Sequence, residues 1–251
     1  MTISISNRKG GSGKTTTSVN VSAALAHQGY TVLLIDADPQ AHTTLSFGIS
    51  LNSTQSDLHS VLVGQIKPER VMMETYLKRL KVIPASRRLT AYEKDNAGNR
   101  EVRTRLAEAI KNINGAFDYI VIDTPPTLSL LTVSALIAST EVLIPMQTHF
   151  LSLEGLAEMV MLIRKINRIY NSNLTLRGVI PTFYRMHTRL AGSIINEIRK
   201  NLGAEIILHP VRMNVSLAEA PGFGKTIFQY NPKCNGAYDY LAIAKQIEGF
   251  S

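Results

Sequence analysis

A glycine-rich segment between an apolar run and a helical pattern constrains the fold of this chain more than any other feature. Residues 2–6 read TISIS, residues 9–15 read KGGSGKT, and a helix-like pattern follows as far as His27. The glycines allow backbone N–H groups to approach phosphate oxygens without a Cβ clash, and a helix that begins at Lys14 directs its positive end to the same place. The segment therefore predicts a strand–loop–helix unit that binds nucleotide phosphates.

Two polar residues at the end of this loop have predicted roles. Lys14 bridges the β- and γ-phosphates, and the Thr15 hydroxyl ligates Mg²⁺. The usual pattern, G-x-x-x-x-G-K-[ST], has a glycine where this chain has Arg8, and an additional lysine, Lys9, stands at the mouth of the loop. The residues predicted to bind the nucleotide here are Gly10, Gly11, Ser12, Gly13, Lys14, Thr15 and Thr16.

Acidic residues follow two other apolar runs. Residues 119–122 lead to Asp123, and residues 32–35 lead to Asp36 and Asp38. Ligands of open α/β sheets bind at the carboxyl ends of the strands, so all three acids are expected to face the nucleotide. Asp123 is predicted to hold the Mg²⁺ water shell, with Asp36 supporting that shell and Asp38 orienting the attacking water. An alternative is that Asp123 only caps the helix that follows it.

Apolar runs alternate with helical patterns along the whole chain. Strands are expected at 3–6, 32–35, 82–84, 119–122, 142–145, 176–180 and 206–208, and helices at 15–27, 100–113, 129–138, 153–170, 191–201 and 237–248. Runs that are apolar on both faces and are separated by helices predict a doubly wound, mostly parallel β-sheet flanked by helices. Residues 50–99 are the least regular part, where short helices and mobile loops are expected. No linker interrupts the pattern, which favours a single domain over residues 1–251 that contains the phosphate loop.

Composition narrows the classes of protein that remain. In 251 residues, 45% are hydrophobic and 18% charged, which is typical of a globular chain. No apolar run approaches the ~20 residues of a membrane helix, and no signal peptide is expected. A single cysteine, Cys234, favours a reducing cytoplasm. The net charge is +8, and residues 161–212 hold nine basic and two acidic side chains. That excess is typical of a partner such as DNA or an anionic membrane, although a solvated basic face remains possible.

Taken together, these motifs resemble the ParA/Soj branch of the ParA–MinD ATPases, the group with a deviant Walker A motif. The resembling stretches are 9–17, 32–40, 117–126, 141–147 and 216–229. The resemblance implies ATP and Mg²⁺ as cofactors. It also implies that Lys9 is the signature lysine, which crosses a two-fold interface to the phosphates of the partner subunit's ATP in a homodimer.

The same resemblance implies that the ATP dimer binds double-stranded DNA without sequence preference. His187 stands where the family places a DNA-contacting arginine, with basic residues on either side. The predicted DNA-binding residues are Arg185, Arg189, Arg199 and Lys200. Residues 212–216 read RMNVS where the family usually has Pro-Arg-Asn-Val-Arg. The predicted contacts to the base are Thr182, Pro210 and Asn214.

The resulting hypothesis is a partition ATPase, cytoplasmic and nucleoid-associated, with slow intrinsic turnover. ATP drives dimerisation and DNA binding, and hydrolysis stimulated by a ParB-like activator releases the dimer and moves a DNA molecule or another cargo. The alternative is a MinD-like membrane-associated positioning ATPase. Residues 241–251 hold one lysine and are expected to pack on the core, so no membrane partner is expected. A metabolic P-loop enzyme is a third class. Cys234 alone cannot supply the cluster ligands of a reductase, whereas a small-substrate ligase is distinguished by brisk ATP turnover with its metabolite and no response to DNA.

Overall fold

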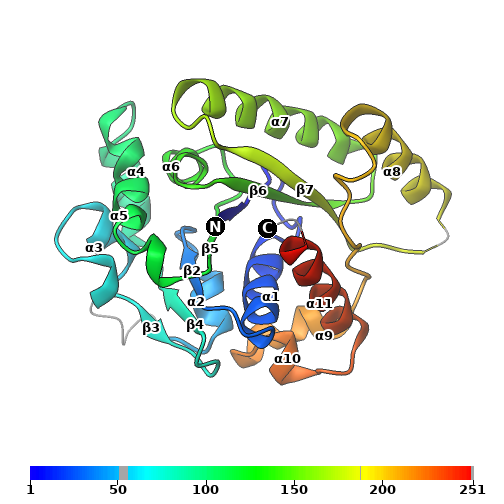
Figure 1. Cartoon of the computed structure of the whole chain (residues 1–251), viewed down its shortest axis with the longest axis horizontal. Helices are drawn as coiled ribbons and strands as arrows, with labels where there is room; N and C mark the ends of the chain where they lie inside the picture. The colour runs from blue at the N-terminus through cyan, green and yellow to red at the C-terminus, as the bar shows by residue number, and fades with distance from the viewer. Residues whose placement is uncertain (51–55, 187, 250–251) are drawn as a thin grey trace.

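One sheet of seven strands organises the molecule (Figure 1). The structure is a computed structural model that describes residues 1–50, 56–186 and 188–249. The strand order is β3-β4-β2-β5-β1-β6-β7, and every neighbouring pair is parallel except β3 and β4. The strands are β1 (Thr2–Ile5), β2 (Val32–Asp36), β3 (Met73–Glu74), β4 (Leu80–Ile83), β5 (Tyr119–Asp123), β6 (Glu141–Gln147) and β7 (Thr175–Thr182). The prediction of a mostly parallel sheet is confirmed.

Helices cover both faces of this sheet. Side chains of β2 alternate between two cores: Val32 and Leu34 pack with α1 and α11, whereas Leu33 and Ile35 pack with α3 to α6. A third core joins β6 and β7 to α7 and α8, which lie along the top of the view in Figure 1. The helices are α1 (Lys14–His27), α2 (His42–Ser46), α3 (Leu58–Leu62), α4 (Arg88–Asp95), α5 (Arg105–Lys111), α6 (Leu130–Ala138), α7 (Leu151–Ile169), α8 (Arg189–Leu202), α9 (Val215–Glu219), α10 (Ile227–Tyr230) and α11 (Asn235–Glu248), with 3₁₀ turns η1 (Pro68–Arg70), η2 (Glu101–Thr104), η3 (Asn114–Ala116) and η4 (Ala220–Phe223).

The expected strand at 206–208 is wrong. This segment makes only an isolated bridge, in which Val179 N–H donates to the Ile206 carbonyl over 2.7 Å and Leu208 N–H donates to the Val179 carbonyl over 3.0 Å. It begins just after a turn at Gly203 and runs into Pro210, so only a short length of backbone can pair with β7.

Two further expectations need correction. The short antiparallel strand β3 was not expected, because two residues carry too little pattern to be recognised. The helix expected at 100–113 is divided into η2 and α5, and α5 ends at Lys111. Within residues 56–99, the short helices α3 and α4 agree with the irregular pattern expected there.

The C-terminal helix packs on the core as expected. In α11, Tyr240, Ile243, Ala244 and Ile247 are fully buried or nearly so, and the helix lies along α1 (Figure 1). Among the described helices, none combines the length and the apolar character that crossing a bilayer requires.

Candidate nucleotide-binding site

The glycine loop between β1 and α1 has the backbone conformation that phosphate binding requires. Gly11 has φ +69° and Gly13 has φ +91°, values that side chains disfavour, and Gly13 immediately precedes α1. A Cβ at Gly13 would lie 3.4 Å from Thr182 Cγ2, so β7 closes one side of the loop. Thr182 Oγ1 donates to the Ser12 carbonyl over 2.9 Å. The loop is thus held between β1, β7 and the N-terminus of α1.

The Ser12 hydroxyl is buried in this cradle, and no described atom is its hydrogen-bond partner. An unpartnered buried hydroxyl is costly unless a ligand pairs with it. Because it lies next to the N-terminus of α1, where backbone N–H groups are free, a phosphate oxygen fits this environment.

Lys14 is held inside the loop. Its Nζ donates to the Lys9 carbonyl over 3.2 Å, and the side chain is buried. Burial lowers the pKa of Lys14, and the negative charges of Asp123 and Asp38 oppose that shift in part. A desolvated ammonium with carboxylates nearby is well placed to pair with a phosphate group.

Thr15 and Asp123 are in direct contact. Asp123 Oδ2 accepts from Thr15 Oγ1 over 2.9 Å and from Thr43 Oγ1 over 2.7 Å, and Asp123 Oδ1 accepts from Ser18 Oγ over 2.9 Å. Asp123 therefore faces the loop and α1, and no capping bond from it to the following helix α6 is seen among the described residues. The alternative reading of Asp123 as a helix cap is not supported.

Asp36 lies beside Asp123 in the sheet, because the two are register partners on β2 and β5. Its Oδ2 accepts from the Thr44 N–H over 2.8 Å and from the Thr44 hydroxyl over 2.6 Å, and its Oδ1 accepts from the Asp38 N–H over 3.1 Å. Burial, followed by the charge of Asp123, raises the pKa of Asp36. Burial likewise raises the pKa of Asp123.

This donor set fits a hard divalent cation. Two fully buried carboxylates and a threonine hydroxyl are oxygen ligands of the kind that Mg²⁺ prefers, and a cation would offset the charge that burial destabilises. The predicted Mg²⁺ residues Thr15 and Asp123 are in direct contact at this point. Asp36 is tied to the first residues of α2 and acts on the site through its charge.

Asp38 follows β2 at the same edge of the sheet. Its Oδ1 accepts from the Gln40 N–H over 2.9 Å, and its charge acts on the pKa values of both Lys14 and Asp123, so it lies close to each of them. The side chain is only 7% exposed. The structure therefore brings Asp38 together with the loop and with Asp123, as the sequence predicts.

The Lys9 side chain has a different partner from that of Lys14. Its Nζ contacts Nε2 of His149, in the segment between β6 and α7, and its backbone N–H donates to Asn7 Oδ1 over 3.0 Å. At the end of β6, Gln147 Nε2 donates to the Gly11 carbonyl over 2.7 Å. Sequence reasoning missed both His149 and Gln147, because a lone histidine and glutamine without metal-ligand spacing carry no recognisable pattern.

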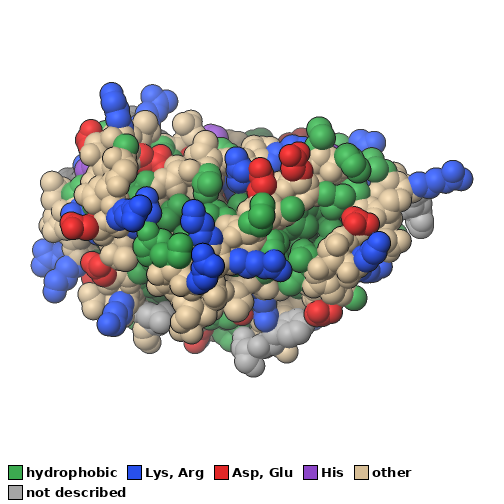
Figure 2. Space-filling model, turned by 90° about the horizontal axis from the view of Figure 1, so that it is seen from above, with side chains coloured by type: hydrophobic (Ala, Val, Ile, Leu, Met, Phe, Trp, Pro, Cys, Tyr) green, Lys and Arg blue, Asp and Glu red, His purple; other side chains and the backbone are tan. Residues whose placement is uncertain are grey.

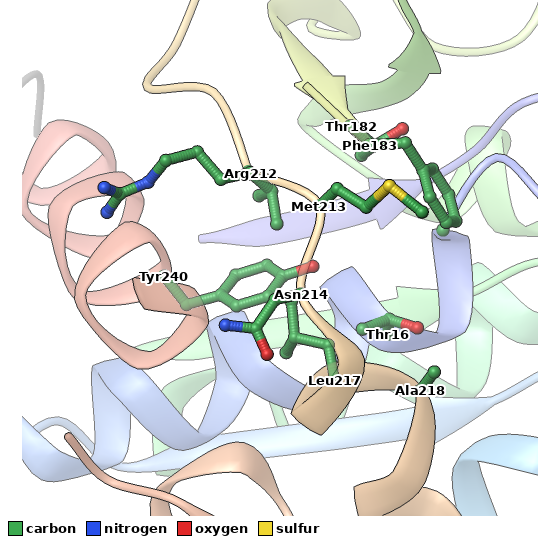
Figure 3. Close-up of a pocket in the computed structure, with 11 residues that line it drawn as sticks. Thr16, Thr182, Phe183, Arg212, Met213, Asn214, Leu217, Ala218 and Tyr240 are labelled. Atoms are coloured by element: carbon green, nitrogen blue, oxygen red, sulfur yellow. The ribbon is translucent and has the colours of Figure 1, made fainter. Parts of the chain in front are cut away.

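A pocket of about 160 Å³ opens beside the loop (Figure 3). Two of the residues predicted to contact the base, Thr182 and Asn214, line it, together with Thr16 of the predicted nucleotide-binding loop. Pro210 does not: it lines a separate hollow with Tyr184, Met186, His209 and Arg212. The pocket wall begins with the following residue, Val211, and continues through Asn214. Pro210 is therefore not kept as a contact to the base.

Apolar side chains make most of the remaining pocket wall. In Figure 3, Met213 extends from the segment after Val211 toward Phe183, and the Tyr240 ring of α11 lies opposite the end of β7. Phe183 has φ +49°, a strained value for an aromatic residue at the exit of β7. Residues that sequence reasoning missed here are Phe183, Met213, Leu217, Ala218 and Tyr240.

The comparisons with known proteins place this site in a family. Residues 1–176 match the family described as an AAA domain. Over 245 residues the chain is 38% identical to the sporulation initiation inhibitor protein Soj of Bacillus subtilis, a match that spans 98% of this chain and 97% of Soj. The chain belongs to the ParA/Soj family of partition ATPases. The resemblance inferred from the motifs is thereby confirmed.

A second partition protein agrees with membership of the ParA/Soj family, and a solved structure of a synthase shares the fold. The chromosome partitioning protein ParA of Caulobacter vibrioides is 36% identical over 247 residues, which span 98% of this chain and 92% of that protein. The crystal structure of cobyrinic acid a,c-diamide synthase from Mycobacterium smegmatis, with bound ATP analogue and magnesium, has a TM-score of 0.83 and 28% identity. That match covers 97% of this chain and 92% of the synthase.

The basic residues predicted to bind DNA in this ParA/Soj-family chain lie around α8. Arg185 precedes the helix and Arg189 begins it, whereas Arg199 and Lys200 belong to its last turn. All four side chains are exposed. At 1.5 Å per residue, the two ends of the set lie roughly 15 Å apart. The structure therefore separates Arg189 from Arg199 and Lys200 along the helix, whereas Arg185 lies before the helix and contacts Met213. His187 lies outside the described residues.

Proposed function

We propose that residues 1–251 act as one ATPase unit that dimerises on ATP, binds DNA without sequence preference and is released by hydrolysis. The observation that carries this proposal is the arrangement of two lysines. Lys14 Nζ donates to a carbonyl of the phosphate loop, whereas Lys9 is half-buried and contacts His149. A cation that does not occupy the cradle can pair with a second triphosphate, which a partner subunit brings.

ATP and Mg²⁺ are the proposed ligands. The phosphates would lie against the N–H groups of residues 10–16, the base would enter the pocket beside Thr182 and Asn214, and Mg²⁺ would be held by Thr15 and Asp123. The buried, unpaired Ser12 hydroxyl and the raised pKa values of the two buried aspartates support this placement. Neutralising the charge of the triphosphate is the chemistry that the ion supplies.

Asp38 is the proposed residue that orients the attacking water. No histidine touches the loop apart from His149 among the described contacts, so the site offers no strong general base, and slow intrinsic turnover is proposed. Asp38→Ala is expected to keep ATP bound and to accumulate a long-lived dimer. Phosphate release measured at the wild-type rate in this variant would remove Asp38 from the mechanism.

The two lysines give a direct test of the dimer. Lys14→Ala is expected to abolish nucleotide binding, whereas Lys9→Ala is expected to bind ATP and stay monomeric. Gel filtration with ATP, together with a fluorescent-nucleotide titration, separates the two outcomes. Lys78→Ala, which removes an exposed lysine before β4, is the matched control and is expected to dimerise. A dimeric Lys9→Ala protein would contradict the proposal.

DNA binding is proposed for the surface formed by Arg185 and Arg189. The electrophoretic mobility of random duplex DNA is measured with the protein and ADP, ATP or a non-hydrolysable analogue. The protein is expected to retard the DNA only when a triphosphate is present. Replacing both arginines by alanine is expected to weaken binding and to lower the salt slope by about two, since each lost phosphate contact removes about 0.9. Arg70→Ala with Arg87→Ala, two exposed arginines elsewhere, is the matched control. If the two double variants show equal salt slopes of DNA binding, Arg185 and Arg189 do not form the DNA-binding surface.

A ParB-like activator and a nucleoid location complete the proposal, because one of the relatives named above, ParA of Caulobacter vibrioides, is a chromosome partitioning protein. A MinD-like membrane ATPase is the alternative. The apolar side of α11 packs on α1 and the core, which favours DNA over a membrane as the partner. Co-sedimentation with anionic vesicles in ATP distinguishes them: binding to vesicles without binding to DNA would overturn the proposed function.

A further inference from the structure

The end of β6 and the segment that follows it contact the phosphate loop at two points. Gln147 Nε2 donates to the Gly11 carbonyl over 2.7 Å, and Lys9 Nζ contacts His149 Nε2. His149 is also fixed by its backbone, because its N–H donates to the Gln147 carbonyl and its carbonyl accepts from the Ser152 N–H. The imidazole is therefore held at the mouth of the loop, against the lysine that the proposed function sends to a partner subunit.

The hydrogen bonds of the imidazole permit two states. An ammonium can only donate, so contact with Lys9 requires a lone pair on Nε2 and places the ring proton on Nδ1, 3.3 Å from Ser152 Oγ. Nε2 also lies 3.1 Å from Gln147 Oε1, which can only accept. A proton on Nε2 would therefore pair the ring with Gln147 and displace the lysine. Nε2 can serve one of these partners at a time.

We propose that His149 is a positioning residue for Lys9: the neutral imidazole holds the lysine within its own protomer, and protonation of the imidazole releases it toward the partner's triphosphate. This inference rests on the proposed ATP dimer. The lysine must leave His149 before it can cross an interface, so the contact competes with dimerisation. Since a free Lys9 and a protonated His149 occur together, formation of the dimer takes up one proton for each protomer.

The charges around His149 agree with the neutral state in the free protomer. Burial lowers the pKa of His149, and the charge of Lys9 lowers it further. The neighbouring Arg8 is paired with Glu158 of α7. The other groups in contact with the ring, Gln147 of β6 and Ser152 of α7, are uncharged, and the acid in the first turn of α7, Glu154, is exposed.

The first experiment measures the contact without nucleotide. The pKa of His149 is determined by NMR titration of the imidazole signals in the ligand-free protein, with His149→Gln used to assign them. Lys9→Met is expected to raise the pKa of His149 toward its ordinary value of about 6.5, because it removes the neighbouring charge. His27, at the end of α1 and in edge contact with Phe228, is the internal control whose pKa should not move. An unchanged pKa of His149 in Lys9→Met overturns the proposal.

The second experiment measures the ATP dimer at pH 7.5 and pH 6.0 by analytical ultracentrifugation with a non-hydrolysable analogue. In the wild type, the dimer is expected to tighten about fivefold as the pH falls, the equivalent of one modest hydrogen bond. The affinity of the dimer rises as pH falls through about 6.5, which is the pKa expected for His149 once Lys9 has left it. The affinity stops rising below the lowered pKa that His149 has in the free protomer.

Three variants separate the possible results. His149→Phe, which has no acceptor for Lys9, is expected to dimerise tightly at both pH values. His149→Gln, whose amide oxygen accepts at every pH, is expected to dimerise weakly at both. His27→Gln is expected to keep the wild-type pH dependence. If dimerisation of His149→Phe also shows the wild-type pH dependence, the proposal is overturned. If the wild type forms no dimer at either pH, the proposed function fails, and the NMR titration alone still decides whether His149 holds Lys9.

Discussion

Strand β5 has an aspartate at each end, and the two have opposite surroundings. Asp118, immediately before the strand, is exposed and accepts from the Thr31 N–H over 2.7 Å and from the Thr31 hydroxyl over 2.6 Å. These bonds lower its pKa. Asp123, the last residue of the strand, is fully buried among three hydroxyls, and burial raises its pKa.

The difference shows which end of the sheet is built for stability and which for a ligand. At the amino end, the charged form of Asp118 is favoured by the fold as it stands. At the carboxyl end, Asp123 and Asp36 place two acids side by side in a dry environment, where their charged forms cost free energy. That cost falls when a cation arrives, so the carboxyl end gives up stability for function.

Loss of hydrolysis is the largest expected difference between the two ends. Asp123→Asn is expected to reduce ATP hydrolysis by at least about 100-fold, because the carboxylate proposed to hold the Mg²⁺ shell is removed. Asp118→Asn, at the other end of the same strand, is the control and is expected to keep the wild-type rate. Phosphate release at saturating ATP and Mg²⁺ measures both rates. Equal rates in the two variants would show that the two ends of β5 do not differ in their importance for hydrolysis.

A smaller effect of opposite sign is expected in stability. At pH 8 without ligand, Asp123→Asn is expected to be more stable than the wild type by about 1 kcal/mol, a rise in Tm of about 2–4 °C. The partners of Asp123 are hydroxyls, which can accept as well as donate, so an amide can replace the carboxylate. Calorimetry checks this, and a fall in Tm would show that Asp123 stabilises the fold in its charged form.

The two ends are also expected to respond to pH in opposite directions. The folded pKa of Asp123 is raised, so the folded state keeps a proton that the unfolded state loses, and the contribution to stability declines as pH rises above about 4. The folded pKa of Asp118 is lowered, so its contribution is present above about 4 and declines as pH falls further. Urea unfolding is measured between pH 3 and pH 8 for the wild type and the two asparagine variants. The differences isolate the contribution of each aspartate to the free energy of unfolding.

The smallest expected effect is the stability cost of Asp118→Asn. Its bonds to Thr31 are exposed to solvent, so the loss is expected to stay below about 1 kcal/mol at pH 7 and to shrink at high salt. Urea midpoints at two salt concentrations measure it. A loss much larger than this, independent of salt, would mean that the amino end of β5 depends on Asp118 as strongly as the site depends on Asp123.

The amino-acid sequence alone determined the phosphate loop, the mostly parallel sheet and the position of the acids at its carboxyl edge. Each of these is a local requirement: Gly11 and Gly13 must adopt positive φ, and an acid directly after a buried strand must lie where that strand ends. Contiguous residues carry such information, so Thr15 and Asp123 could be expected at one site although 108 positions separate them.

Tertiary structure decided the rest. It placed His149 against Lys9 and Tyr240 in the pocket wall, and it turned Pro210 out of the pocket in favour of Val211. None of these positions follows from a local pattern, because each depends on how separate elements pack around the loop. The backbone of a loop is specified by its own residues, whereas the side chains that surround it are chosen by the packing of the whole sheet and its helices.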